Sequence, residues 1–437
     1  MNEILLIIAQ IFFILFLINS SKQLIPHKFT IKNFSYFDNI SLNIILFINI
    51  LLLLSLLSLN INIIFYSILF VLILCNLNKI KNRSFFSLNF EIINISFFLL
   101  IFIFTLDLAT KIKMGWDAEF FWYLKTLNFY QNNNISNLNN LIVADYPHLG
   151  SLIWSLFWKY PFNYSEYFGR IAYLVIFFSS IYSFYSSLKT DFYLKIILIL
   201  LTTTIIYNYE LFSGLQEIIV FSIILTIVKF SYLLINSKNL TNQKKLVLFI
   251  LLATNAVCWI KNEALIFAGI FIFSLLFVSE LNIKVKKYLI FGTLIILLVR
   301  SGYLLINDIS FESSEFGKTF DSNRFDLINF FDDLKITLFY YIVYFIQMPI
   351  MIIGLLVFLY ILFYEKKSYS FKKFMIIFLT INFSFTIFAF LFNFEDVEWQ
   401  IRTGMKRFMF ESAAFYMLPL LHILNSRFKI NDKRNKI

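Results

Sequence analysis

The stretch FMIIFLTINFSFTIFAFLF, residues 374–392, decides the fold class because it contains no charged side chain. A helix needs about 20 mainly apolar residues to cross the hydrocarbon core of a bilayer, so this stretch is typical of a membrane-spanning helix. The whole chain of 437 residues has the same character, since 60% of it is hydrophobic and only 14% is charged. Soluble domains carry about 25% charged residues. The sequence therefore predicts an all-α, polytopic membrane protein and excludes a disordered, collagen-like or disulfide-rich secreted chain.

Apolar segments of this kind recur along the chain, and we expect about thirteen transmembrane helices. One of them, residues 336–364, is unusually long and contains Pro349. The segments are Ile4–Ile18, Ser41–Ser58, Ile61–Leu77, Ile92–Ala109, Tyr167–Leu188, Phe192–Tyr209, Leu215–Ile235, Leu246–Ile260, Ala264–Val278, Tyr288–Ile306, Ile336–Tyr364, Phe374–Phe392 and Phe408–Leu424.

The placement of lysine and arginine predicts the topology. With thirteen helices, the strongly basic intervals all fall on one side, which the positive-inside rule makes cytoplasmic. The N-terminus then lies outside, together with residues 110–166, the Lys261–Glu263 turn, the acidic Asn307–Lys335 loop and residues 393–406. The basic residues are Lys22, Lys28, Lys32, Lys79, Lys81, Arg83, Lys238, Lys244, Lys245, Lys284, Lys286, Lys287, Lys366, Lys367, Lys372, Lys373, Arg427, Lys429, Lys433 and Arg434.

Charge and cysteine content add two exclusions. The net charge of +11 is typical of basic cytoplasmic loops in a membrane protein, so we expect no nucleic-acid partner. Cys75 and Cys258 lie in apolar runs and are interpreted as buried apolar residues, without a disulfide or a zinc site. No internal repeat or linker is visible, so residues 1–437 are predicted to form a single membrane domain.

The outer loop at residues 110–166 carries the first candidate catalytic residues, Asp117 and Glu119. Two residues apart, they face the same way in an extended chain and diverge on a helix. Asp117 could be the N-cap of a helix that begins at Ala118, runs to about Tyr130 and lies in the membrane interface. It could also serve as a general base, and the two roles are compatible.

Further candidates are ionisable residues on the outer side. His148, before a short apolar run that we expect to be interfacial, fits an ordinary loop residue better than a ligand. Lys261 and Glu263 either keep a tight hairpin hydrated or line a cavity. Arg300 lies inside an apolar helix, where an arginine either snorkels or is functional. The last two candidates, Arg402 and Arg407, precede the final apolar segment.

Four short motifs resemble the GT-C superfamily of integral-membrane glycosyltransferases, which includes the protein O-mannosyltransferases and the lipid A aminoarabinose transferase. The motifs are Trp116-Asp117-Ala118 followed by Lys125, then Asp145-Tyr146-Pro147, then Lys261 to Ala264, and finally Arg407. The resemblance covers roughly Asp107–Leu424. Its acidic loop follows the fourth predicted helix rather than the first. We therefore interpret residues 1–90 as an N-terminal extension and residues 91–425 as the catalytic core.

The resemblance implies an inverting transfer of sugar from a polyprenyl-phosphate carrier to an acceptor hydroxyl on the non-cytoplasmic face. The acceptor would be a lipid, a glycan or a protein, and the membrane a bacterial inner membrane. Asp117 would be the base, and Glu119 would orient the acceptor or bind a metal. The cofactor is unknown: this chemistry could use a divalent metal, and the sequence leaves that open. The substrate-binding residues would be Lys261, Glu263, Arg300, Arg402, Arg407 and His148.

Two other functions remain open. An O-antigen-type polymerase or ligase is expected to have a late, arginine-rich outer loop, whereas residues 307–335 are acidic. A sugar or lipid transporter or flippase should show paired halves and broken helices, and the sequence shows neither. No nucleotide-binding motif is present, which argues against ATP-driven transport.

Overall fold

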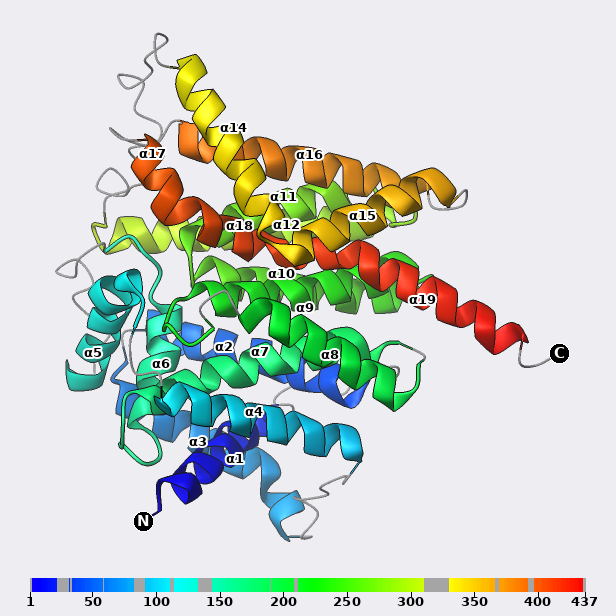
Figure 1. Ribbon diagram of the computed structural model, residues 1–437. Helices are drawn as coiled ribbons and strands as arrows, with labels where there is room; N and C mark the ends of the chain where they lie inside the picture. The colour runs from blue at the N-terminus through cyan, green and yellow to red at the C-terminus, as the bar shows by residue number, and fades with distance from the viewer. Residues whose placement is uncertain are drawn as a thin grey trace. The chain divides into compact units, whose positions relative to one another are not determined.

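The computed structural model describes residues 2–21, 31, 34–57, 59–81, 91–110, 114–132, 144–188, 190–207, 211–309, 330–365, 369–391 and 397–434. All regular elements within these ranges are helices, as predicted (Figure 1). They form two compact units, each described below by itself. Unit 1 comprises residues 1–138 and 148–226, and unit 2 comprises residues 139–147 and 227–437.

Unit 1 is built around helix α7, Tyr167–Ser186, whose span is buried along its entire length. The helices α1, α2, α4, α6 and α8 all pack against α7. An aromatic and aliphatic sequence such as YFGRIAYLVIFF can be buried on all sides because neighbouring helices surround it. The other elements are α1 (Glu3–Ser21), α2 (Tyr36–Leu56), α3 (Ile61–Lys81), α4 (Ile92–Thr110), the π-helix η3 (Ala118–Trp122), α5 (Tyr123–Asn132), α6 (Leu149–Lys159) and α8 (Phe192–Tyr207).

Unit 2 contains the second half of the chain, and α9 (Glu217–Asn236) begins in unit 1 and ends in unit 2. Helix α11 packs against α10 and α16, while α15 packs against α19. The elements are α10 (Leu240–Cys258), α11 (Asn262–Leu275), α12 (Ile283–Ile306), α14 (Phe330–Ile346), α15 (Pro349–Tyr364), α16 (Tyr369–Leu391), α17 (Val397–Gln400), the π-helix η6 (Ile401–Met405), α18 (Lys406–Ala413), the 3-10 turn η7 (Ala414–Tyr416) and α19 (Met417–Arg434).

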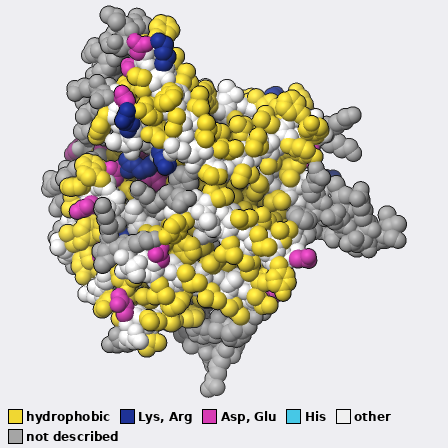
Figure 2. Space-filling view, in the orientation of Figure 1, with side chains coloured by type: hydrophobic (Ala, Val, Ile, Leu, Met, Phe, Trp, Pro, Cys, Tyr) yellow, Lys and Arg dark blue, Asp and Glu magenta, His cyan; other side chains and the backbone are white. Residues whose placement is uncertain are grey.

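The surface is that of a membrane protein. Figure 2 shows hydrophobic side chains over most of the visible face. On α12, for example, Leu298 is 71% exposed and Leu305 is 77% exposed. Exposed leucines on a helix of this length and hydropathy are expected when lipid rather than water surrounds it.

Each of the thirteen predicted segments overlaps a helix of the structure. Among the described residues, eight helices are long and apolar enough to cross a membrane, or nine if the bent pair α14 and α15 forms one span. Three shorter apolar helices lie in α3, α8 and α11. The count of thirteen spans stays a prediction, as does the division at residue 90. The helices α1 and α2, which precede that division, pack against α7 within unit 1.

One predicted helix is broken. Residues 336–364 were expected to form a continuous span, but α14 ends at Ile346, α15 begins at Pro349, and the two are bent by 89°. Proline lacks the N–H that continues a helix and disfavours helical geometry in the residue before it. Met348 accordingly has φ −110° and ψ 88°. The sequence interpretation that no helix is broken is therefore wrong at this position.

The bent helix packs closely against η7. A Cβ built on Gly354 would lie 2.1 Å from the carbonyl oxygen of Tyr416. The ring of Phe345, on the other side of the bend, lies 6.1 Å from the ring of Tyr416. Residues from both arms thus contact Tyr416, and only glycine allows the approach on the α15 side.

We predict that Gly354→Ala destabilises the protein by about 1–3 kcal/mol, because α15 must move away from a backbone carbonyl. The matched control is Gly302→Ala in α12, where a new Cβ would meet nothing within 4 Å. That variant should be neutral or stabilising by about 0.4–1 kcal/mol. Unfolding of the purified protein in detergent measures both effects. Equal midpoints for the two variants would contradict the contact.

Candidate functional site

The predicted base, Asp117, lies at the start of an irregular helix in unit 1. The carbonyl of Gly115 accepts a hydrogen bond from the backbone amide of Glu119 at 2.9 Å. The first helical turn therefore already contains Asp117. Its backbone is helical and its side chain makes no capping hydrogen bond. The interpretation of Asp117 as the N-cap is therefore wrong. Asp117 is half-buried, whereas Glu119 is exposed, and on this helix the two side chains diverge.

Two π-helical segments adjoin the predicted catalytic and phosphate-binding residues. The first, η3, follows Asp117 and contains Glu119. The second, η6, contains Arg402 and ends shortly before Arg407. Single π-turns are rare and are frequent at functional sites, because an extra residue in the turn redirects side chains. The sequence contains no signal that predicts them.

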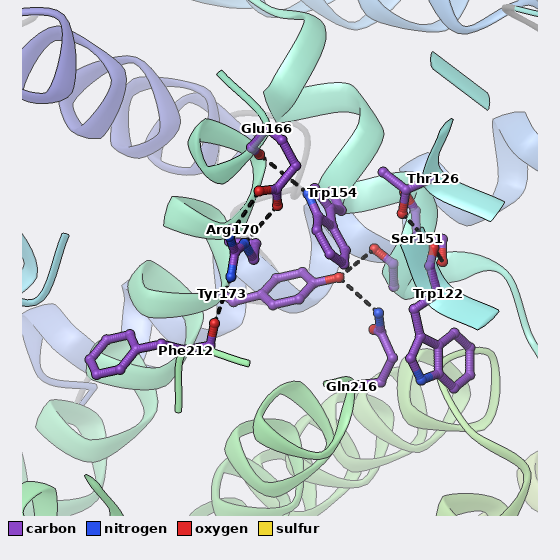
Figure 3. Close-up of polar contacts among 10 residues, drawn as sticks. Trp122, Thr126, Ser151, Trp154, Glu166, Arg170, Tyr173, Phe212 and Gln216 are labelled. Atoms are coloured by element: carbon purple, nitrogen blue, oxygen red, sulfur yellow. Dashed lines mark hydrogen bonds and ion pairs between the residues drawn. The ribbon is translucent and has the colours of Figure 1, made fainter. Parts of the chain in front are cut away.

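Side chains of α5 and α6 hold the end of η3. The carbonyl of Trp122 accepts hydrogen bonds from Thr126 Oγ1 at 2.8 Å and from Ser151 Oγ at 3.0 Å (Figure 3). Next to them, Tyr173 donates to the carbonyl of Gly150 at 3.0 Å and accepts from Gln216 Nε2 at 2.9 Å. These bonds are buried and fix the short helices of unit 1 to α7.

A buried ion pair completes this part of unit 1. Glu166 contacts Arg170 Nε at 2.7 Å across one helical turn. Burial raises the pKa of the Glu166 carboxyl, and the charge of Arg170 opposes that shift. The sequence analysis assigned no role to either residue, although their i, i+4 spacing at the start of an apolar span is a recognisable signal.

His148 is a buried residue, not an ordinary loop residue. Its side chain is within unit 1, with Nε2 3.2 Å from Ser55 Oγ and its ring at 6.2 Å from that of Phe129. The histidine thereby links the end of α2 to the start of α6. These contacts suit a structural residue, and its role in substrate binding stays a prediction.

In unit 2, the turn between α10 and α11 carries a buried ion pair. Lys261 Nζ lies 2.6 Å from Glu411 Oε1, and Glu411 is fully buried in α18. The pair joins two helices far apart in sequence. The sequence analysis assigns no role to Glu411, because a fully buried carboxylate is recognised only once its partner is known.

Arg300 lies close to the same turn. It is 4% exposed and lies on the buried stripe of α12 with Ile296 and Leu304, so it does not snorkel into lipid. Its Nη2 donates to Asn262 Oδ1, and its guanidinium lies 5.6 Å from the centre of the Trp259 ring.

Two polar atoms near Arg300 have no hydrogen-bond partner. Among the described residues, Arg300 Nη1 is buried without an acceptor, and Glu263 Oε2 is buried without a donor. Asp145 and Glu263 both interact electrostatically with the guanidinium. The structure therefore brings three predicted binding residues, Lys261, Glu263 and Arg300, to one turn and adds Asp145 from the Asp-Tyr-Pro motif.

The last two predicted cations have other contacts. Arg402 is exposed, donates from Nε to Glu398 Oε1 at 3.0 Å and lies 5.5 Å from the Tyr340 ring centre. Arg407 is half-buried and donates from Nε to the carbonyl of Thr403 at 3.2 Å. Their predicted role in phosphate binding stays a prediction.

The described residues contain no group of three or more His, Cys, Asp or Glu side chains that could hold a metal ion. Comparisons of the chain with models of protein families, with curated proteins and with solved structures give no match. The GT-C resemblance therefore rests on the short motifs alone.

We predict that Glu411→Gln destabilises unit 2 by about 3–5 kcal/mol, because it leaves the ammonium of Lys261 buried beside a neutral partner. The control is Glu398→Gln, which breaks the exposed pair with Arg402 and should leave the midpoint nearly unchanged. Adding Lys261→Met to Glu411→Gln should recover part of the loss. Unfolding titrations in detergent measure all three. A Glu411→Gln midpoint equal to that of Glu398→Gln would contradict a stabilising role for the buried pair.

Proposed function

We propose that this protein is a glycosyltransferase that moves a sugar from a polyprenyl-phosphate carrier to an acceptor hydroxyl on the outer face of a bacterial plasma membrane. One observation carries the proposal most directly. Arg300 is buried in an apolar helix and held in place by Asn262, and its Nη1 has no acceptor among the residues that the structure describes. A fixed guanidinium with an open donor suits an anionic oxygen such as that of a phosphate.

The carboxylate of Glu263, close to Arg300, suits the sugar part of such a substrate. Glu263 Oε2 is a buried acceptor for which the described part of the chain offers no donor, and a sugar hydroxyl supplies one. A ligand with a phosphate oxygen next to a hydroxyl would complete both groups. Leaving either group unsatisfied in a buried site is costly, so this pairing favours a sugar phosphate over a purely apolar ligand.

The surroundings of Arg300 favour a lipid-linked substrate. The turn of α12 that ends at Arg300 exposes Leu297, Leu298 and Val299, so apolar surface adjoins the buried guanidinium along one helix. A carrier with a prenyl chain could keep that chain in the membrane while its phosphate reaches Arg300. A free sugar phosphate would not use this surface.

The proposed step is an inverting substitution at the anomeric carbon. The acceptor oxygen bonds to this carbon as the bond from the carbon to the phosphate oxygen breaks. Asp117 takes the acceptor proton as the general base. The electron pair of the broken bond leaves with polyprenyl phosphate, whose developing charge calls for cations such as the guanidinium of Arg300. Glu119 diverges from Asp117 and suits the orientation of the acceptor better than a shared proton transfer.

A specific observation also favours the transporter or flippase alternative. The α14–α15 pair is a broken helix, and discontinuous helices are common at the binding sites of secondary transporters. In this alternative, the substrate would cross the membrane without cleavage. For the polymerase or ligase alternative, most of the relevant loop, residues 310–329, lies outside the described residues.

The first functional prediction concerns Asp117→Asn, which should retain the fold and carrier binding but lose turnover. An amide cannot accept the acceptor proton, and loss of a general base costs about a hundred- to ten-thousand-fold in rate. Transfer from a synthetic polyprenyl-phosphate sugar in proteoliposomes measures the effect. Glu119→Gln is the control and should be milder. Near-normal turnover of Asp117→Asn would exclude the base role.

The second prediction concerns Arg300→Lys, which keeps the charge but loses the planar fork. It should weaken binding of the carrier by about tenfold or more, because a lysine cannot bond both Asn262 and a phosphate with the same geometry. Arg427→Lys is the matched control, because Arg427 lies in α19 on the predicted cytoplasmic side and has no assigned role in binding. Binding of radiolabelled carrier to purified protein compares the two. Equal affinities would contradict the role of Arg300.

A further inference from the structure

A segment of three consecutive residues in unit 1 connects the interior of the unit to the start of η3. These residues are Phe212, Ser213 and Gly214. The carbonyl of Ser213 accepts the amide of Gly115 at 2.9 Å. Gly214 has φ +78°, and a Cβ built there would lie 3.3 Å from the Cβ of Ala118. Since Gly115 and Ala118 flank Trp116 and Asp117, this segment determines where Asp117 lies.

The other end of the segment is held by Arg170. Its Nη1 donates to the carbonyl of Phe212 at 2.6 Å. Its other nitrogens bind Glu166, with Nη2 at 2.8 Å from Oε2. Figure 3 shows the guanidinium between the carboxylate of Glu166 and the backbone of Phe212. Arg170 is 2% exposed, so its side chain is held in place among these partners.

Trp154 supports both ends of this connection. Its indole lies 5.7 Å from the Arg170 guanidinium, and its Nε1 donates to the carbonyl of Glu166 at 3.3 Å. The far edge of the same ring packs against Gly214, because a Cβ there would lie 2.9 Å from Cη2. One side chain therefore spans the distance from the ion pair to the residue that contacts Ala118.

We infer that Arg170 is a positioning residue that fixes the start of η3, and with it Asp117, through the backbone of residues 212–214. The inference about catalysis rests on the proposed function, in which Asp117 is the base. The fixed helix start is a property of unit 1 by itself. Arg170 does not need to touch substrate. A lysine cannot replace it, because only the planar guanidinium can bond Glu166 and the carbonyl of Phe212 at the same time.

The test is Arg170→Lys in the full-length protein, with hydrogen–deuterium exchange as the first measurement. The amides of residues 114–122 should exchange about tenfold faster or more, because the loss of a buried, charge-assisted bond to Phe212 loosens the helix start. Gly214→Ala should have the same effect from the other end, because its Cβ would press on Trp154 and Ala118. Exchange in α2 should not change in either variant.

The matched control is Tyr185→Phe, which removes a buried bond to Thr202 Oγ1 at 2.7 Å near the opposite end of α7. It should leave exchange at residues 114–122 unchanged. Unchanged exchange in Arg170→Lys would overturn the positioning inference. So would equal acceleration in Tyr185→Phe, since the effect would then be general loosening of α7.

The second measurement is sugar transfer. Arg170→Lys should lower kcat by about ten- to a hundredfold, as expected for a displaced catalytic group, with little change in KM for the carrier lipid. A loss confined to KM, or no loss, would overturn the link to Asp117. Failure of the proposed function is distinguishable, because the wild-type protein would then transfer no sugar while the exchange result for Arg170→Lys stayed as expected. Failure of the base role alone would appear as normal transfer by Asp117→Asn.

Discussion

An ionised side chain in an apolar surrounding is stable only beside a partner, and this constraint governs where the chemistry of this protein can lie. In unit 1 the charge of Arg170 is balanced by Glu166, and in unit 2 that of Lys261 is balanced by Glu411. The Lys261–Glu411 pair joins the start of α11 to α18, whereas the Glu166–Arg170 pair lies within the first turn of α7. Arg300 differs from both, because it donates to a neutral amide and its Nη1 has no acceptor within the described ranges. We propose that this open donor binds a ligand.

The same constraint explains what could be predicted from the sequence. A charge-free stretch such as residues 374–392 can only be stable in lipid as a helix, and all thirteen predicted segments overlap helices. The rare charges within or beside such segments also predicted residues that lie together, since Lys261, Glu263 and Arg300 are found around one turn. Pairing partners were harder to predict. Glu411 is 150 positions from Lys261, and nothing local in the sequence connects them.

Local backbone irregularities were the main features that sequence reasoning missed. Pro349 was noted, but neither the 89° bend nor the packing of Gly354 and Phe345 against Tyr416 was predicted. The π-turns η3 and η6 leave no signature in composition or periodicity. Arg170 was overlooked because it lies in the first turn of an apolar span, where the run of aromatic and aliphatic residues dominates the pattern. Its partner at i−4 was the available signal.

We propose Asp117 as a general base and Arg300 as a phosphate-binding cation. The central claim is that the carrier lipid is cleaved. The most direct measurement incubates purified protein in proteoliposomes with a polyprenyl-phosphate sugar labelled in both the sugar and the lipid, and follows both labels over time. The account predicts that polyprenyl phosphate appears in a one-to-one ratio with sugar bound to acceptor. Movement of the intact, doubly labelled lipid between leaflets without any release of polyprenyl phosphate would contradict it.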